Sequence, residues 1–247
     1  MTTNTSLEQH TVVVTGAGRG LGLVIVGSLL AQGARVIANH RSPSPDLDAL
    51  HKEFPDRLDL VQGDIGDEPT AQALADVARA TGRLDALICN AAIARDDLLV
   101  RTSVEDWDEV QRVNVRGSFL ATKHALKLMM RRRRGRIIYV SSVVGHMGNA
   151  GQASYAASKA ALVGLAKSVA QEYGNYNVRT AVVSPGLLDT GLGQELDPDY
   201  QQRIMDRGLT GKGNSARLAD IVNFLITPGA DLINATVIHA EGGIRYP

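Results

Sequence analysis

The chain has 247 residues, of which 44% are hydrophobic and 21% charged, a composition typical of a globular protein with a substantial core. Its formal net charge is +0, so no overall field attracts nucleic acid or an anionic membrane, and we expect neither as a partner. Residues 1–16 show no secretory pattern, no apolar run is of membrane-spanning length, and the single cysteine excludes an intrachain disulfide, so we expect a cytoplasmic protein.

Short runs rich in β-branched residues alternate with segments that have a helical pattern. We expect strands at 11–16, 35–39, 58–64, 84–92, 136–142, 178–186 and 236–243, and helices at 20–32, 68–81, 103–130, 154–173 and 215–226. Most strand runs are apolar throughout, which is typical of strands covered on both faces. The pattern therefore predicts a single α/β domain over 1–247, a Rossmann-like, doubly wound parallel sheet of about seven strands with helices on both faces.

Glycines after the first predicted strand indicate a phosphate site. Gly16, Gly20 and Gly22 form the pattern T-G-x-x-x-G-x-G at a strand-to-helix turn that also contains Arg19 and Leu21. Backbone N–H groups at a helix N-terminus bind a dinucleotide pyrophosphate, and glycine allows its close approach. Any strand-to-helix turn can use glycine, but this position before a helix favours the phosphate site.

The second predicted strand ends in Asn39, His40 and Arg41, with no carboxylate to accept from the ribose hydroxyls. Arg41 and Arg19 can instead bind a 2′-phosphate, so we expect NADPH as the cofactor. Asp64, after the third strand, is placed to bind the adenine edge or to act as a turn residue.

Further cofactor contacts are expected where later strands end. Asn90 and the small Ala91 follow the fourth strand, where they either let the cofactor pass closely or simply form a tight strand end. A rigid turn at Pro185 and Gly186 is expected beside the nicotinamide. The remaining predicted cofactor contacts are Ile65, Leu188 and Thr190.

Tyr155 and Lys159 stand four residues apart and share one face of the predicted helix 154–173. Free tyrosine, with a pKa of about 10, is a poor acid–base catalyst near neutrality. A nearby ammonium and an oxidised nicotinamide would lower that pKa, and the ammonium would also bind the ribose. Both residues are therefore candidates for catalysis and cofactor binding, the alternative being a buried tyrosine beside a lysine that reaches solvent.

Two more polar groups support a catalytic interpretation. The fifth predicted strand ends in Ser141 and Ser142, where a hydroxyl can donate to a substrate carbonyl oxygen. Asn114 lies within a predicted helix, which is unfavourable unless its side chain or backbone has another role. Holding a water in a proton relay from Lys159 would be such a role. We expect no metal site.

These motifs, in the order TGAGRGLG, CNAA, Asn114, Ser142, YAASK and SPG, resemble the short-chain dehydrogenase/reductase family over essentially the whole chain. The resemblance implies a catalytic tetrad of Asn114, Ser142, Tyr155 and Lys159. The chain departs from the family pattern N-N-A-G at Cys89 and Ala92, which affects cofactor contacts and not the tetrad.

Within the family, segments 93–99 and 135–162 resemble β-ketoacyl-[acyl-carrier-protein] reductases, whereas the tail INATVIHAEGG departs from them. The resemblance implies NADPH-dependent reduction of a 3-oxoacyl thioester on acyl-carrier protein, in fatty-acid or polyketide and other secondary-metabolite assembly. It also implies a homotetramer in which helices 103–130 and 154–173 pair across an interface. The alternatives are an enzyme acting on a free alcohol or ketone (a sugar, steroid or xenobiotic) and a catalytically idle scaffold subunit.

A run of arginines lies at the end of helix 103–130. The default interpretation is a solvated basic end that complements the helix dipole. An acyl-carrier protein is acidic, however, and basic groups near the mouth of the active site would attract it. The resemblance implies a docking role here, with Arg133 as the best match among Arg131, Arg132, Arg133 and Arg134.

Overall fold

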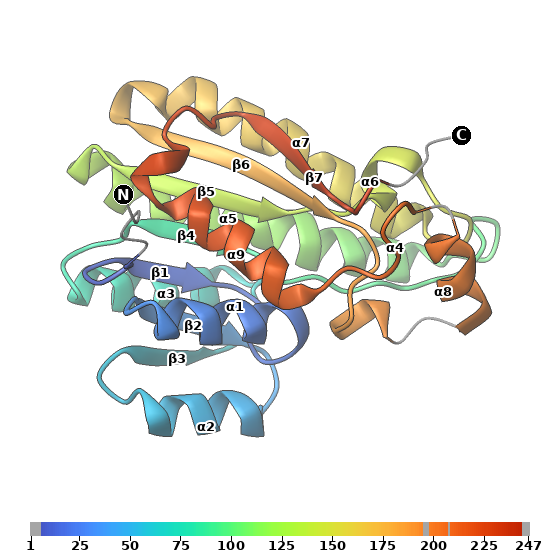
Figure 1. Ribbon diagram of the computed structural model, residues 1–247. Coiled ribbons are helices and arrows are strands. Elements are labelled where there is room, and N and C mark those ends of the chain that lie inside the picture. Colours follow the sequence, from blue (N-terminus) through green and yellow to red (C-terminus); the bar gives the residue numbers. More distant parts are fainter. Residues whose placement is uncertain (1–5, 195–197, 207, 244–247) are drawn as a thin grey trace.

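The computed structural model describes residues 6–194, 198–206 and 208–243, without the side chains of residues 200 and 203. Its centre is one parallel sheet (Figure 1) with the strand order β3-β2-β1-β4-β5-β6-β7. The strands are β1 (Thr11–Val14), β2 (Arg35–His40), β3 (Leu58–Gln62), β4 (Ala86–Cys89), β5 (Gly135–Val140), β6 (Val178–Pro185) and β7 (Thr236–Ala240). Each strand falls on a predicted run, so the predicted fold class is confirmed.

Helices cover both faces of the sheet (Figure 1). On one face lie α1 (Gly20–Ala31), α2 (Pro45–Glu53) and α9 (Ser215–Ile226); on the other lie α3 (Glu68–Ala80), α5 (Gly117–Arg132) and α7 (Ala153–Tyr173). Successive strand residues enter opposite cores, so that Val12 and Val14 face the first layer and Val13 the second. Within the described part of the chain, no helix is long and apolar enough to cross a membrane.

Two helical segments differ from the sequence prediction. Helix α2 was not predicted because it buries only Leu47, although Ser44 caps it by accepting from the Leu47 N–H and Pro45 occupies its first turn. The expected helix 103–130 is divided into α4 (Val104–Gln111), a π-helical segment (Arg112–Arg116) and α5. Such π-helical interruptions often lie at functional sites.

Segment 187–214 has several glycines, one proline and no steady periodicity. This sequence pattern predicts either a lid or substrate loop, or two short surface helices without a gating role. It contains a 3₁₀ turn (Gly191–Gly193) and α8 (Pro198–Met205), while residues 195–197 and 207 lie outside the described residues. The Gly213 N–H donates to the Leu187 carbonyl at 2.7 Å, and the Asp189 N–H donates to the Gly213 carbonyl at 3.0 Å. The segment therefore leaves and rejoins the body of the protein at one point.

The order of the strands positions the functional site. Strand β1 pairs with β2 on one side and β4 on the other, so the chain reverses its direction of winding between β1 and β4. Loops that leave the carboxyl ends of these two strands diverge to opposite faces of the sheet. They leave a crevice between them, which is where open α/β sheets bind ligands.

Candidate active site

A cleft of about 570 Å³ occupies this crevice at the carboxyl edge of the sheet. Every residue predicted to bind the cofactor lines it, as do the predicted catalytic residues apart from Asn114. These lining residues are Gly16, Arg19, Gly20, Leu21, Gly22, Arg41, Asp64, Ile65, Asn90, Ala91, Ser142, Tyr155, Lys159, Pro185, Gly186, Leu188 and Thr190.

The glycine turn has a shape that only glycine allows. Gly16 has a φ of +65°, and a Cβ atom there would lie 2.6 Å from the Ala91 Cα atom. A Cβ atom at Gly22 would lie 2.2 Å from the Gly16 carbonyl oxygen. Asn90 holds the turn by donating to the carbonyl oxygens of Thr15 at 3.0 Å and Gly16 at 3.1 Å. The N-terminus of α1 is therefore open to the cleft without side chains in the way, as a pyrophosphate site requires.

The departures from the family pattern differ in their consequences. Cys89 faces the core, is 2% exposed, and burial raises the pKa of its thiol to about 12. It therefore does not contact the cleft, whereas Ala92 does line it. The substitution at position 89 leaves the cofactor surface unchanged.

Of the three polar residues at the end of β2, Asn39 and His40 are buried and Arg41 is exposed. Asn39 is buried, accepts from the Gly16 N–H at 3.4 Å and donates to the Gly63 carbonyl at 2.9 Å. The ring of His40 contacts the Ser42 carbonyl at 2.9 Å. Arg41 is exposed and lines the cleft together with Arg19. Two guanidinium groups therefore lie at this end of the cleft, with no carboxylate among residues 39–41.

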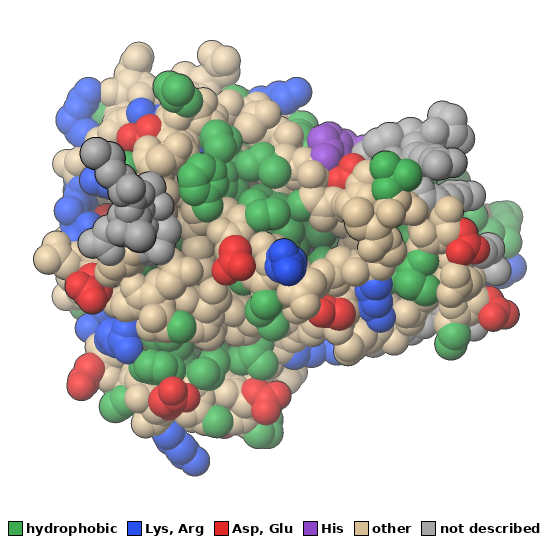
Figure 2. Space-filling view, viewed as in Figure 1, with side chains coloured by type: hydrophobic (Ala, Val, Ile, Leu, Met, Phe, Trp, Pro, Cys, Tyr) green, Lys and Arg blue, Asp and Glu red, His purple; other side chains and the backbone are tan. Residues whose placement is uncertain are grey.

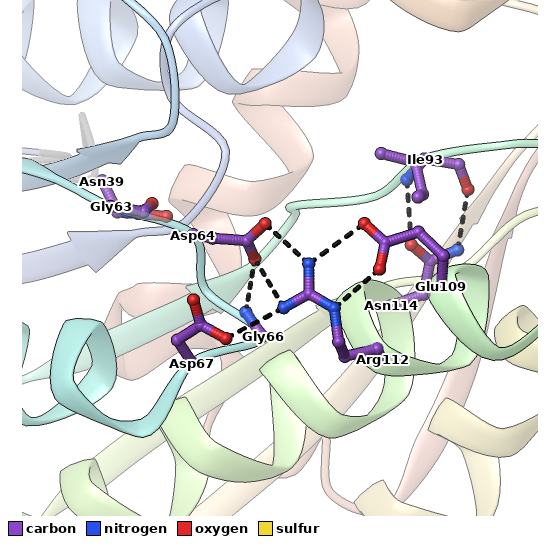
Figure 3. A network of polar contacts seen from close by, with 9 residues as sticks. All are labelled: Asn39, Gly63, Asp64, Gly66, Asp67, Ile93, Glu109, Arg112 and Asn114. Atoms are coloured by element: carbon purple, nitrogen blue, oxygen red, sulfur yellow. Dashed lines mark hydrogen bonds and ion pairs between the residues drawn. The ribbon is translucent and has the colours of Figure 1, made fainter. Parts of the chain in front are cut away.

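Asp64 lines the cleft, but its carboxylate already has protein partners (Figure 3). Arg112 donates to its Oδ2 at 2.8 Å, and the Gly66 N–H donates to its Oδ1 at 2.8 Å. Burial alone would raise the pKa of Asp64, yet these donors hold it below its ordinary value. Asp64 is thus an ionised and fixed group at the adenine end, and it acts as a turn residue as well.

The two serines after β5 have different partners. Ser141 is buried and donates to the Lys159 carbonyl oxygen at 2.8 Å. Ser142 lines the cleft and accepts from the Val144 N–H at 3.2 Å, and its hydroxyl acts to lower the pKa of Tyr155. Of the pair, Ser142 is the one available to a substrate.

Tyr155 and Lys159 face the same cleft, and burial shifts the pKa of both. The Lys159 Nζ atom lies 5.6 Å from the centroid of the Tyr155 ring and donates to the Val140 carbonyl at 2.8 Å. Burial raises the pKa of Tyr155 to about 12, against the hydrogen bond with Ser142, and lowers the pKa of Lys159 to about 8. The protein side chains by themselves therefore raise the pKa of Tyr155, because burial outweighs the effect of Ser142. The expected lowering by Lys159 together with an oxidised nicotinamide stays a prediction.

Asn114 lies within the π-helical segment and is 1% exposed. Its Oδ1 accepts from the Ile93 N–H at 2.9 Å, and its Nδ2 donates to the Ile93 carbonyl at 3.0 Å and to Ser158 Oγ at 2.9 Å. Both amide hydrogens are occupied. The side chain therefore fastens the loop after β4 to α7, and a relay water is not needed to explain its place in a helix.

Asp96 and Gln152 line the cleft and were not predicted by the sequence analysis. Gln152 donates to Asp96 Oδ2 at 2.7 Å and accepts from Asn149 at 2.8 Å. Burial raises the pKa of Asp96, against the hydrogen bond from Gln152, and the Asp96 charge in turn raises that of Tyr155. The position of Gln152 one turn before Tyr155 was the available signal, but without the fold nothing placed it in the cleft.

The basic segment 131–134 does not flank the cleft, so the expectation that it lies near the active-site mouth is wrong for a single chain. Arg132 donates to the Gly82 carbonyl, before β4, and Arg133 to the Asn175 carbonyl, before β6. Both contacts lie at the amino edge of the sheet, where Figure 2 shows Lys and Arg side chains on the left of the molecule. The reason is topological, since a helix that precedes a parallel strand ends where that strand begins.

The profile of the short chain dehydrogenase family matches residues 10–201, and the chain belongs to this family. It is similar to the 3-oxoacyl-[acyl-carrier-protein] reductases FabG of Salmonella typhimurium (35% identity) and Escherichia coli (34% identity), in each case over 97% of this chain and 98% of the relative. Nodulation protein G of a Rhizobium species is 37% identical over 96% of this chain and 98% of its own.

Among solved structures, the chain is similar to a gluconate 5-dehydrogenase from Burkholderia cenocepacia in complex with NADP and tartrate. The TM-score is 0.90 and the sequence identity 27%, over 97% of this chain and 96% of the other. The 3-oxoacyl-[acyl-carrier-protein] reductases and the gluconate 5-dehydrogenase carry names of different substrates.

Proposed function

We propose that the protein is an NADPH-dependent reductase that converts a 3-oxoacyl thioester, carried on acyl-carrier protein, to the 3-hydroxyacyl thioester in fatty-acid or polyketide assembly. The observation that carries the proposal is the convergence of Ser142, Tyr155 and Lys159 on one cleft that the glycine turn also lines. The similarity to 3-oxoacyl reductases over nearly the full length supports this choice of substrate.

The residues present fit a nicotinamide dinucleotide, which supplies the hydride when bound. The glycine turn would hold the pyrophosphate at the N-terminus of α1, and Lys159 would bind the ribose. Ser142 donates a hydrogen bond to the substrate carbonyl oxygen and orients it. Tyr155 gives its proton to the same oxygen, and its high pKa keeps that proton on the phenol until the alkoxide develops. Asn114 keeps the loop after β4 in place beside α7.

The choice of NADPH over NADH is supported by the end of β2. Arg41 and Arg19 line the cleft there, and a planar guanidinium binds a phosphate through two parallel hydrogen bonds. Asn39 and His40 are engaged with backbone groups and offer no acceptor comparable to a carboxylate. A 2′-phosphate is therefore favoured over a free hydroxyl at this position.

The substrate end of the cleft favours an acyl chain over a sugar acid. Its described lining includes Ile93, Val144, Leu187, Leu192 and Ile204. Among the described lining residues, the basic side chains other than Lys159 come from the β1 and β2 ends, at the opposite part of the cleft. A gluconate carboxylate would have no guanidinium partner here, whereas an aliphatic chain would bury apolar surface.

Reduction or oxidation of a free ketone or alcohol is the second candidate, because the gluconate 5-dehydrogenase has the same fold over nearly its whole length. Asp96 and Gln152 would then bind substrate hydroxyls. A catalytically idle scaffold is a weaker alternative, since it would not require Ser142, Tyr155 and Lys159 to converge on one cleft.

We also infer a homotetramer. Val104 and Trp107 of α4 and Phe119 of α5 are exposed on one surface. Phe224 of α9 and Leu232 are exposed on another, where Figure 2 shows apolar side chains gathered over α9 and β7. Two separate apolar surfaces suit an assembly with two kinds of interface. Light scattering with size-exclusion chromatography tests this inference through the molar mass.

The function is tested by following NADPH consumption with a 3-oxoacyl chain on acyl-carrier protein, with the same chain on a small thioester, and with 5-ketogluconate. The proposal expects turnover of both thioesters, a preference for the carrier-linked one, and a loss of at least about 10²-fold in Tyr155→Phe. Turnover of 5-ketogluconate alone would establish the second candidate. Tight NADPH binding without turnover of any of the three would overturn the proposal and favour the scaffold.

A further inference from the structure

Arg112 is the first residue of the π-helical segment, and its guanidinium joins three carboxylates (Figure 3). Its Nη2 donates to Asp64 Oδ2 at 2.8 Å and its Nη1 to Asp67 Oδ1 at 3.1 Å. Its Nε donates to Glu109 Oε2 at 2.6 Å. The side chain is only 28% exposed, so these are partly desolvated contacts of defined geometry rather than mobile surface pairs.

The turn that contains Asp64 packs directly against the π-helical segment. A Cβ atom at Gly66 would lie 2.4 Å from Arg112 Nη1, and a Cβ atom at Gly117 would lie 2.8 Å from Ile65 Cγ2. No larger residue fits at either position without a shift. Because Asp64 and Ile65 line the cleft, one wall of its adenine end is held against this segment.

The same segment leads to the catalytic end of the cleft. Asn114 is two residues after Arg112 and donates to Ser158 Oγ at 2.9 Å. Ser158 Oγ in turn donates to the Tyr155 carbonyl oxygen at 2.7 Å. The backbone of the π-helical segment, together with these polar contacts, therefore connects the adenine end to the helix that carries the phenol.

We propose that Arg112 is a positioning residue for the cofactor, which fixes the Asp64 carboxylate at the adenine end of the cleft and fastens it to the turn that holds Asn114. The proposal rests on the cofactor part of the proposed function and requires no particular substrate. Lysine would not suffice at this position, because a single ammonium cannot span three carboxylates in the way that a planar guanidinium does.

The charges around Asp64 give this role a distinctive signature. The cations that act on it are Arg112 and Arg41, and the nearby anions are Asp67 and Glu109. Without Arg112, only the Gly66 N–H and Arg41 would offset the effects of burial and of the two carboxylates on the pKa of Asp64. Its pKa would then rise, and the carboxylate would begin to lose its charge in mildly acidic solution.

The experiment is calorimetric titration of NADP⁺ into the purified protein at pH 7.5 and pH 5.5. We expect Arg112→Gln to bind NADP⁺ roughly tenfold more weakly than the wild type at pH 7.5. The dissociation constant of Arg112→Gln divided by that of the wild type should be larger at pH 5.5 than at pH 7.5. Protonation of the 2′-phosphate affects both proteins equally and therefore cancels in this ratio. Arg112→Lys should restore a ratio that is independent of pH, with an intermediate affinity.

Arg116→Gln is the matched control, because Arg116 ends the same segment, is exposed, and has no hydrogen bond or ion pair to any residue that the structure describes. It should bind NADP⁺ as the wild type does. A ratio for Arg112→Gln that is the same at both pH values and equal to that of Arg116→Gln would overturn the proposal.

If Arg112→Gln does not fold, Glu109→Gln releases one side of the guanidinium and should give a smaller weakening in the same direction; no weakening would overturn the proposal. Wild-type protein that binds neither NADP⁺ nor NAD⁺ would refute the cofactor assignment itself, and this inference with it. Wild-type binding with unaffected variants would refute the role of Arg112 alone.

Discussion

The ammonium of Lys159 donates a hydrogen bond to the carbonyl oxygen of Val140 at 2.8 Å, in a position where the lysine is 2% exposed. Val140 is the last residue of β5, directly before the two serines. The lysine is thus held by the strand that delivers Ser142, and its charge lies within the protein rather than in solvent. Its protonation is therefore coupled to folding.

This burial predicts how stability depends on pH. Because the folded-state pKa of Lys159 is lowered to about 8, the unfolded chain binds a proton that the folded chain releases between about pH 8 and pH 10.5. The free energy of unfolding of the wild type, minus that of Lys159→Met, should therefore increase by about 2 kcal/mol between pH 7.5 and pH 9.5. Above pH 10 the raised pKa of Tyr155 acts in the opposite direction.

The measurement is urea unfolding of both proteins at the two pH values. Lys159→Met retains the apolar stem, so the comparison isolates the charge. A difference in stability between the two proteins that does not change with pH would contradict the buried, easily deprotonated lysine.

Substitutions of the two serines after β5 should affect different properties, catalytic activity at Ser142 and stability at Ser141. Ser142→Ala removes a hydroxyl that faces the cleft and should lower kcat by roughly 10²-fold or more, with a Tm close to that of the wild type. Ser141→Ala removes a buried side-chain donor to the Lys159 carbonyl oxygen and should lower the free energy of unfolding by about 1 kcal/mol. Steady-state kinetics and thermal denaturation of both variants check this, and equal losses of kcat would contradict it.

Removal of the guanidinium at the end of β2 should reduce the discrimination between cofactors. We expect Arg41→Ala to weaken NADP⁺ binding about tenfold and to leave NAD⁺ binding nearly unchanged, because only the 2′-phosphate loses a partner. Titration of both dinucleotides into the variant and the wild type provides the ratio. An equal weakening for both would place Arg41 away from the phosphate.

Two glycines of α1 provide a matched pair. Gly22→Ala would bring a Cβ atom 2.2 Å from the Gly16 carbonyl oxygen, whereas a Cβ atom at Gly27 would meet nothing within 4 Å. We expect Gly22→Ala to destabilise the fold by about 2 kcal/mol or more and to abolish NADP⁺ binding. Gly27→Ala should stabilise the helix by about 0.5–1 kcal/mol. Unfolding curves and calorimetry distinguish the two variants. A Gly22→Ala protein that is as stable as the wild type and binds NADP⁺ equally well would contradict the close packing of the glycine turn.

The segment 187–214 tests the lid hypothesis. Its ends are joined by the hydrogen bonds of Gly213, and Ile204 of α8 lines the cleft. If the segment closes over bound cofactor, NADP⁺ should slow tryptic cleavage after the exposed Lys212 several-fold. Cleavage at an unchanged rate would favour fixed surface helices with no gating role. Cleavage elsewhere in the chain serves as the internal control.

The sequence pattern predicted the seven strand segments, the glycine turn and many of the residues that line the cleft. Apolar runs and turn glycines are local features, and their effect on the backbone needs no distant contact. Helix α2 was missed because its short apolar face gives a weak periodic signal, although the Ser44–Pro45 pair was available as a start signal.

What only the tertiary structure decided depends on contacts between residues far apart in the chain. The pairing of Arg112 with Asp64 brings together positions on two different elements, and sequence spacing cannot reveal it. The direction in which the pKa of Tyr155 shifts follows from burial, which outweighs the effect of the Ser142 hydroxyl. The placement of the arginines at 131–134 follows from the direction in which α5 enters the sheet. Local pattern therefore specified which residues take part, while desolvation and long-range pairing decided what each of them contacts and how it is charged.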